Sequence, residues 1–470
     1  MDLAIAIDFG STFTKGVLFD LTRTSLLASA YEPSTVDTDV RVGLRKVLAR
    51  LSETAGRSLA GVPAYVCSSA AGGLRMIVIG LVPSLSLEAA QRAALGAGAK
   101  IIGAYGHKLP PATLKAIEAA RPDLVLLAGG IDGGDEETIL HNARALAASA
   151  LTAPVIVAGN ASVASDCSRL LEDAGKTAFL APNILPEIDR IEIDTVHTII
   201  RELFVGHITR AKGIERVAGE VALDSEICPT PSAVLQACRL LSQGVDGRTG
   251  WGDIVVADIG GATTDIHSAA SGAPTRPGAI PRGLPELFLK RTVEGDLGMR
   301  ANAATIVERA GQAAVLSLAS GLAGRSLPAA ALSDYVNRVG AAPDYVPRDE
   351  TEAVLDAAMA RAAIKLAMQR HAGRVREVYT GAGPALVQHG KDLTNVATVI
   401  GVGGVLARGR YGEFALSGVL RSLEESEILC PAGPRFLIDR AYVLFAIGLL
   451  AEVAPQAAFD LAQALLEPAA

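Results

Sequence analysis

The sequence has few aromatic residues and lacks a long hydrophobic run. Aromatic residues make up 4% of the 470 residues. Mean hydropathy is +0.34, but no stretch approaches the roughly 18 consecutive apolar residues of a transmembrane helix. The opening Met-Asp-Leu has no basic segment before an apolar one, so no secretory signal is predicted. We therefore expect a cytoplasmic protein without membrane spans.

Cysteine is also scarce, and its spacing excludes common metal sites. The five cysteines are scattered: Cys67, Cys167, Cys228, Cys238 and Cys430. No two form a C-x-x-C pair, which disfavours a zinc or iron–sulfur site. A dehydratase activator with a bridging iron–sulfur cluster is disfavoured for the same reason. The pattern is typical of reduced thiols in a cytoplasm.

The charge lacks a strong excess of either sign. Forty-three basic and 50 acidic residues are well mixed and give a net charge of −7. This argues against a nucleic-acid-binding surface. Half of the residues are hydrophobic, enough to build a large core. At about 150 residues per domain, the length predicts roughly two to four domains.

Strand and helix patterns predict an α/β protein with two lobes, residues 1–247 and 251–470. Strands are expected at 3–8 and 16–21, and a helix at 38–54. Between 74 and 187, strand-like and helix-like stretches alternate, which predicts a parallel sheet in an α/β insert of the first lobe. Its expected strands are 76–82, 124–128, 155–158 and 177–180, and its expected helices are 86–97, 136–150 and 162–174.

The rest of the chain is predicted to be more helical. A helix is expected at 195–212, and the turn-rich residues 244–250 read as a hinge or linker. Helices dominate 285–372. Further expected elements are strands at 253–258, 375–379 and 396–402 and a final apolar helix at 439–452, which we expect to return to the interface between the lobes.

Two glycine turns with the same pattern carry the functional signal. Residues 8–15 read DFGSTFTK and residues 258–265 read DIGGATTD. Each follows an apolar strand and leads into another. Glycines let a ligand approach the backbone closely, and successive N–H groups then form a nest for an anion. Hydroxyl side chains add donors. Ordinary glycine-rich hairpins are the alternative, but the repetition favours two turns that bind one triphosphate.

The charged residues of these turns suit Mg²⁺ and phosphate. An aspartate at a strand end repels phosphate but can hold Mg²⁺, which bridges it to phosphate oxygens. We expect Asp8 and Asp265 to hold hydrated Mg²⁺ and Asp258 to place or activate water. Lys15 supplies a mobile positive charge for the terminal phosphates. A third turn, 401–404 (GVGG), would let a purine pack against bare backbone, with Arg408 over its face.

In their residue patterns and their order along the chain, these motifs resemble those of the ATPase superfamily of actin, DnaK-type chaperones and sugar kinases. The first turn is similar to its phosphate-one motif, the second to its phosphate-two motif and the third to its adenosine motif. Residues 230–235 and 439–448 resemble its two connecting helices. The resemblance implies two actin-like (ribonuclease-H-like) lobes around an ATP cleft. The sequence departs from the chaperone pattern at Thr230, where chaperones carry an acidic residue. Glu226 is nearby but not at the matching position.

A narrower resemblance covers the whole chain. Residues 68–75, 127–134, 158–160 and 293–298 resemble the MutL/GlmL-type accessory proteins, encoded beside adenosylcobalamin-dependent glutamate mutase and unrelated to the mismatch-repair protein of similar name. The resemblance implies an ATP-driven reactivase or chaperone whose partners are mutase subunits, with no nucleic acid or membrane partner. A small-molecule kinase and a nucleotide-binding scaffold with little hydrolysis remain alternatives.

Motifs and resemblance together give one set of expected site residues, with ATP and Mg²⁺ as ligands. The expected catalytic residues are Asp258, Asp8 and Lys15; the nucleotide-binding residues are Gly10, Ser11, Thr12, Gly260, Gly261, Ala262, Thr263, Gly401, Gly403, Gly404 and Arg408; and the metal-binding residues are Asp8 and Asp265.

Overall fold

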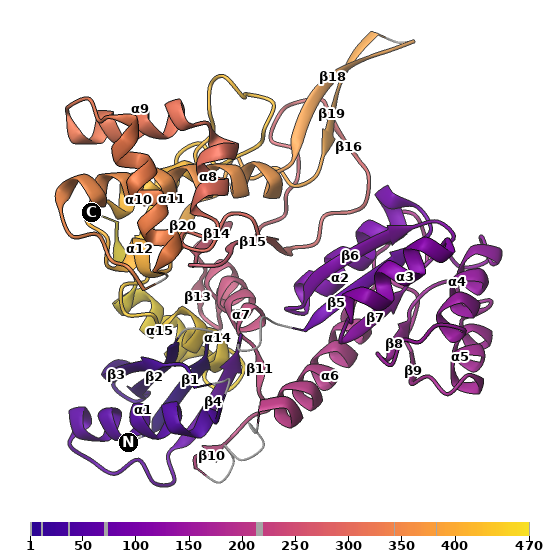
Figure 1. Cartoon of the computed structure of the whole chain (residues 1–470), viewed down its shortest axis with the longest axis horizontal. Helices are drawn as coiled ribbons and strands as arrows, with labels where there is room; N and C mark the ends of the chain where they lie inside the picture. Colours follow the sequence, from indigo (N-terminus) through magenta and orange to yellow (C-terminus); the bar gives the residue numbers. More distant parts are fainter. Residues whose placement is uncertain are drawn as a thin grey trace. The chain divides into compact units, whose positions relative to one another are not determined.

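The computed structural model divides into two compact units, with strands and helices in both (Figure 1). It describes residues 2–10, 13–35, 38–69, 74–212, 220–342, 344–381 and 383–469. Unit 1 comprises Met1–Ala233 and Gly283–Pro285, and unit 2 comprises Val234–Arg282 and Glu286–Ala470. The division rests on contacts within the chain. The predicted lobe bounds, and the return of the C-terminal helix to their interface, stay predictions.

Unit 1 begins with a sheet whose central strand carries Asp8. Strand β1 (Leu3–Phe9) pairs antiparallel with β2 (Phe13–Asp20) and parallel with β4 (Pro63–Ser68). β2 in turn pairs antiparallel with β3 (Ser25–Pro33), and β4 pairs parallel with β10 (Ala222–Leu223) and β11 (Cys228–Pro229). The apolar sequence of β1 fits this central place, because its residues from Ala4 onward are all buried.

One helix of unit 1 packs on this sheet. Helix α1 (Val40–Ala55) begins after Asp39, whose carboxylate accepts a hydrogen bond from the Arg41 amide, and ends at Gly56 with a φ of 63°. Both are common helix-capping arrangements. Its buried Leu44, Val47 and Leu51 belong to the same core cluster as Ile5 and Ile7 of β1.

A second sheet in unit 1 is entirely parallel. Its strand order is β6-β5-β7-β8-β9, which is 2-1-3-4-5 in chain order. The strands are β5 (Arg75–Gly80), β6 (Lys100–Gly106), β7 (Leu124–Leu127), β8 (Val155–Val157) and β9 (Ala178–Leu180). The four strands predicted between 74 and 187 are present, and β6 is additional. Whether this region is an insert stays a prediction.

Helices cover both faces of the parallel sheet, as its alternate buried side chains require. Met76 and Val78 of β5 share a core cluster with α2 and α6, whereas Ile77 and Ile79 share one with α3, α4 and α5. The helical elements are a π-helix η2 (Pro83–Leu87), α2 (Glu88–Gly96), α3 (Pro111–Ala120), α4 (Glu137–Ala147), α5 (Ala164–Asp173) and α6 (Asp194–Lys212). Helix α7 (Thr230–Gln243) runs across the division between the units.

The main sheet of unit 2 repeats the topology of the first sheet of unit 1. β14 (Ile254–Ile259) pairs antiparallel with β15 (Thr264–Ala269), which pairs antiparallel with β17 (Leu289–Glu294). On its other side β14 pairs parallel with β20 (Thr398–Val402), followed in parallel by β21 (Arg435–Ile438). Strand β22 (Glu467–Pro468) closes the edge. The α/β fold class is confirmed, and the repetition agrees with two look-alike lobes.

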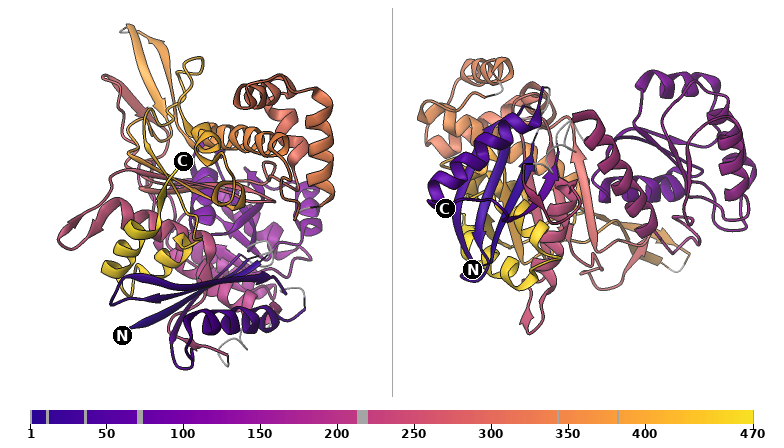
Figure 2. Two further views of the ribbon diagram at one scale, coloured as in Figure 1. Left: turned by 90° about the vertical axis from the view of Figure 1, so that its left-hand side faces the viewer. Right: turned by 90° about the horizontal axis from the view of Figure 1, so that it is seen from below.

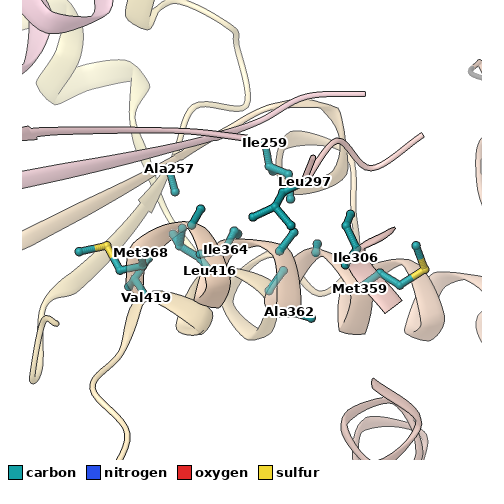
Figure 3. Close-up of a cluster of buried hydrophobic side chains, with 14 of the residues drawn as sticks. Ala257, Ile259, Leu297, Ile306, Met359, Ala362, Ile364, Met368, Leu416 and Val419 are labelled. Carbon is teal, nitrogen blue, oxygen red and sulfur yellow. The ribbon is translucent and has the colours of Figure 1, made fainter. Parts of the chain in front are cut away.

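Helices of unit 2 pack around α11 (Glu350–His371), which is buried along most of its length. Its Met359, Ala362, Ile364 and Met368 contribute to the core cluster in Figure 3, which also contains Ala257 and Ile259 of β14. The other helical elements are α8 (Ala303–Ala310), α9 (Gln312–Ala323), α10 (Ala329–Ala341), α12 (Gly404–Ala407), α13 (Gly412–Leu416), the 3-10 helix η4 (Ser417–Val419), α14 (Leu444–Leu450) and α15 (Pro455–Leu465).

A smaller sheet extends from unit 2. It contains β16 (Ala279–Arg282), β19 (Gly383–His389) and β18 (Arg374–Thr380) in that order. The hairpin of β18 and β19 projects away from the helices of this unit (Figures 1 and 2). No helix within the described ranges is long and apolar enough to cross a membrane.

Two predictions about local structure are wrong. Residues 244–250, expected to be an irregular hinge or linker, form a hairpin of β12 (Gly244–Val245) and β13 (Arg248–Thr249), because Gly247 takes the positive φ of 76° that the tight turn requires. The helix expected at 439–452 spans only 444–450. The Asp439 carboxylate accepts hydrogen bonds from the Val443 and Leu444 amides, which caps the helix there.

Candidate functional site

The first glycine turn joins β1 to β2 in unit 1. The Gly10 amide donates a hydrogen bond to the Phe13 carbonyl over 3.0 Å. Asp8 and Lys15 lie directly opposite each other in the antiparallel register. Ser11 and Thr12, predicted to bind phosphate, lie outside the described residues. The predicted catalytic pair Asp8 and Lys15 is therefore together at the base of this turn.

Asp8 is 4% exposed and surrounded by donors. The Thr230 hydroxyl donates to its Oδ1 over 2.7 Å, and the Cys67 thiol lies 3.6 Å from the same oxygen. The Lys15 ammonium is 3.7 Å from Oδ2. Burial, followed by the charge of Asp8, raises the pKa of the Cys67 thiol well above its usual value. Cys67 is thus a neutral donor and not a nucleophile.

The second turn, between β14 and β15 in unit 2, has the same backbone hydrogen bond. The Gly260 amide donates to the Thr263 carbonyl over 2.9 Å. The carbonyl of Gly260 accepts from the Met299 amide, and that of Gly261 accepts from the amides that follow at 300 and 301. The turn's carbonyls are therefore directed toward residues 299–301.

Three successive amides of this turn are available to a ligand. Within the described part of the chain, the amides of Gly261, Ala262 and Thr263 have no hydrogen-bond partner. Gly261 and Ala262 are exposed, and Thr263 is half-buried. Successive N–H groups without partners form a concave site for an anion. This arrangement suits phosphate oxygens.

Two carboxylates and one arginine lie below the second turn. Asp258 and Asp265 face each other across the β14–β15 pair. Oδ1 of Asp265 accepts hydrogen bonds from Nε and Nη2 of Arg291 on β17, over 3.0 and 2.7 Å. Its Oδ2 accepts one from the Thr263 hydroxyl over 3.0 Å. The Arg291 side chain is 7% exposed, so this ion pair is nearly buried.

A buried histidine lies on the same side of β15 as Asp265. His267 is paired in register with Arg291 of the neighbouring strand and is 1% exposed. Burial, followed by the positive charge of Arg291, lowers the pKa of His267 to about 3, whereas the charge of Asp265 opposes this shift. His267 is therefore neutral near pH 7 and does not compete with Arg291 for Asp265.

The third turn follows β20, which lies beside β14. Asp258 pairs with Val402 in this parallel register. A Cβ at Gly403, whose φ is 112°, would lie 2.1 Å from the Ile259 carbonyl oxygen, so only glycine fits there. Gly401 is also closely packed, whereas a Cβ at Gly404 would meet only the Tyr442 hydroxyl, 3.5 Å away. Arg408, predicted to cover a purine, has its guanidinium carbon 5.9 Å from the Tyr442 ring centre.

The described residues contain no ready-made metal cage. No cluster of three or more histidine, cysteine, aspartate or glutamate side chains with suitable positions occurs among them. Mg²⁺ at a phosphate site commonly uses only one or two carboxylates, with waters and phosphate oxygens as its other ligands. The carboxylates of Asp8, Asp258 and Asp265 therefore fit such an ion in chemical type. Arg291 and Thr263 already bond to both oxygens of Asp265.

Arg291 is the residue that sequence reasoning missed. It lies 26 positions after Asp265 and meets it only because β17 pairs with β15. No local motif marks it. The contact could be found only from the register of β15 and β17. The sequence analysis expected mainly helices in residues 285–372 and did not predict β17.

Comparison with known proteins gives a family match over nearly the whole chain. A family model described as "MutL protein" matches residues 4–466. The chain is also 41% identical over 461 residues to "Protein MutL" of Clostridium tetanomorphum, covering 97% of this chain and 98% of that protein.

Solved structures show weaker likeness. An acetone carboxylase in its nucleotide-free structure has 12% identity and a TM-score of 0.42, covering 95% of this chain and 70% of that one. Gluconate kinase from Lactobacillus acidophilus has 12% identity and a TM-score of 0.35, with 99% and 92% covered. The activator of the 2-hydroxyisocaproyl-CoA dehydratase from Clostridium difficile, with bound ADPNP, has 9% identity and a TM-score of 0.31, covering 97% of this chain and 95% of that one. Scores this low say nothing about this chain's ligand.

Proposed function

Because the chain belongs to the MutL protein family, we propose that it is an accessory protein of an adenosylcobalamin-dependent mutase, such as glutamate mutase, and that it binds and hydrolyses ATP. The single observation that carries ATP binding is the exposed row of amides at 261–263. The role toward a mutase rests on the family resemblance.

In the proposed ATP-bound state, each turn contributes a different kind of contact. The amides of the second turn donate to phosphate oxygens, as a nest does for an anion. Lys15 adds a positive charge for the terminal phosphates; its ammonium lies 3.7 Å from Asp8. Gly10, Ser11 and Thr12 are proposed as the matching backbone and hydroxyl donors of the first turn.

Mg²⁺ is the proposed partner of the phosphates. It would neutralise charge on the triphosphate as the terminal phosphoryl group leaves. Asp8 is the proposed carboxylate of unit 1, held in place by Thr230. In unit 2, Asp265 is already bonded to Arg291 and Thr263, so we propose that it acts on the ion through water.

Asp258 is the proposed residue that orients or activates the attacking water. It is the second-last residue of β14, directly before Ile259, and faces Asp265 across the strand pair. The proposed role rests on this position at the start of the turn, close in sequence to the amides of residues 261–263. Conversion of ATP to ADP removes the terminal phosphate contacts, and the resulting change in the protein is proposed to act on the mutase.

The function is tested with the purified full chain, Mg·ATP and an inactivated adenosylcobalamin-dependent mutase. We expect ADP formation and recovery of mutase activity; failure of both would reject the proposal. Asp258→Ala is expected to retain ATP binding and lose hydrolysis. Asp253→Ala, at the residue directly before the same strand, is the matched control. If turnover of Asp258→Ala stays within about threefold of wild type, roughly 0.7 kcal/mol of barrier, Asp258 isn't catalytic.

A nucleotide-binding scaffold with little hydrolysis is the second candidate, and one observation favours it. Thr230 stands at the position where the chaperones of the resemblance carry an acidic residue. Its hydroxyl donates a hydrogen bond to Asp8, and a hydroxyl is a much weaker base for water than a carboxylate. Retention of uncleaved ATP for hours by the protein, with the mutase present, would decide for this function.

A further inference from the structure

The three-stranded sheet of unit 2 has one face with three exposed arginines. In the register of β18, β19 and β16, Arg374 lies opposite His389, and His389 lies opposite Arg282. Arg376 is two residues along β18 on the same face. All four side chains are exposed. This sheet face (Arg282, Arg374, Arg376 and His389) is called the arginine face below.

Two acidic residues on or beside β18, Glu377 and Glu427, lie on the other face of the sheet. Glu377 alternates with the arginines along β18 and therefore points to the opposite side of the sheet. Glu427 lies opposite Val375, because Arg374 forms a bridge with Ile428, so it too belongs to that side. Among the described residues, no carboxylate lies within ion-pair distance of Arg282, Arg374 or Arg376. The positive charge of the arginine face is thus not neutralised locally, on a chain whose net charge is −7.

The outer edge of β18 has backbone groups directed to solvent. Pro384 lies opposite Tyr379 and has no amide hydrogen, so that pair is of the type without hydrogen bonds. Amides at 375, 377 and 379 therefore point away from β19. The Val375 amide donates to the Glu427 carbonyl, which agrees with its pointing away from β19. The amides of Glu377 and Tyr379 have no such partner in the part of the chain that the structure describes.

Apolar side chains flank this edge and the arginine face. Ile280, two residues before Arg282 on β16, is 52% exposed and shares the arginine face. Tyr379 is 86% exposed and lies on the other face with Glu377, beside the strand edge. An exposed strand edge with apolar side chains is a template for pairing with another extended segment. The strand edge supplies main-chain bonds, Ile280 and Tyr379 supply apolar area on the two faces of the sheet, and the arginine face selects negative charge.

We propose that this surface docks an acidic, extended segment of the partner mutase, which adds to β18 as a further strand. The inference rests on the proposed function, since it names the surface through which the accessory protein reaches its mutase. Charge complementarity is the reason for proposing an acidic segment. The negative net charge of this protein repels such a segment elsewhere, whereas the arginine face attracts it.

The test measures binding of the full chain to purified mutase and amide exchange of β18 in the complex. Arg374→Glu/Arg376→Glu is expected to weaken binding about tenfold or more at low salt. Lys46→Glu/Lys115→Glu, two exposed lysines of unit 1, changes the net charge equally and is expected to leave binding unchanged. The amides of Glu377 and Tyr379 are expected to become protected.

A second pair of variants tests the strand edge apart from the charge. Glu377→Pro removes one outward amide without breaking the β18–β19 ladder and is expected to weaken binding, whereas Glu377→Thr keeps the amide and is expected to bind like wild type. ATP turnover of the chain alone is expected to stay unchanged in all of these variants.

The outcomes separate this inference from the proposed function. Mutase binding without protection of β18, or equal binding by Arg374→Glu/Arg376→Glu, overturns the docking surface and leaves the accessory function intact. Absence of any mutase binding by wild type overturns both. Binding of a single-stranded oligonucleotide or of phosphatidylserine vesicles through these arginines, in preference to mutase, overturns the choice of occupant.

Discussion

The two glycine turns share a backbone hydrogen bond but differ in the charge of the eighth residue of the motif. In each, the glycine at the third position donates to the carbonyl three residues later, and an aspartate lies opposite the eighth residue of the motif. That eighth residue is Lys15 in unit 1 and Asp265 in unit 2. The first turn pairs its aspartate with a cation from its own hairpin, whereas the second must obtain one, Arg291, from the next strand. One hairpin thus places an aspartate opposite a lysine, and the other places two aspartates opposite each other.

The largest expected effect comes from removing the cation of the second turn. Arg291→Met leaves Asp265 without its nearly buried partner, and we expect the free energy of unfolding of unit 2 to fall by about 3 kcal/mol. The exposed pair of Arg169 and Asp166 offers the same substitution as a control, and Arg169→Met is expected to cost about 0.5 kcal/mol or less. Urea unfolding measures both. Equal costs would show that Asp265 does not depend on Arg291.

Alanine at the matching glycines compares the two backbones. A Cβ at Gly10 would lie 2.7 Å from the Phe13 carbonyl oxygen, so the backbone must shift, and we expect Gly10→Ala to cost about 2 kcal/mol. The corresponding distance from Gly260 to the Thr263 oxygen is 3.2 Å, which a small adjustment relieves, so Gly260→Ala is expected to cost about 1 kcal/mol or less. Thermal unfolding tests this order; the reverse order would contradict the geometry.

Acid is expected to weaken the second unit through His267. Its pKa is about 3 when folded, below the ordinary value of 6.5, because it is buried. Between these values the unfolded chain binds the proton and the folded chain does not, so stability falls as the pH drops below 6.5. At pH 5 the loss is expected to be about 1 to 2 kcal/mol. His267→Gln should show a shallower decline between pH 7 and 5 in urea unfolding; an unchanged slope would exclude this histidine.

Much of the fold followed from local patterns. Apolar runs such as Ile254–Ile259 and the alternation of strands and helices between 74 and 187 were sufficient to predict most strands there. Strand β6 was missed because its lysine, two glycines and tyrosine interrupt the apolar run. Strands β16 and β19 were missed because they contain proline, which the small open sheet tolerates at Pro281 and Pro384.

The candidate site was predictable only in its local part. Asp8, Lys15, Asp258 and Asp265 are marked by motifs, and the structure brings each pair together across a hairpin. The contact of Thr230 with Asp8 spans 222 positions in sequence, and Arg291 reaches Asp265 through strand register. Such contacts depend on tertiary pairing, which no local spacing encodes.

Amide exchange of the full chain in Mg·ATP tests the central claim most directly. If a single triphosphate is bound by both turns, peptides covering residues 8–15 and 258–265 should both exchange more slowly with Mg·ATP than without nucleotide, and both should lose much of this protection in Mg·ADP. Protection of neither turn at saturating ATP, or protection of one with the other unchanged, would contradict the account.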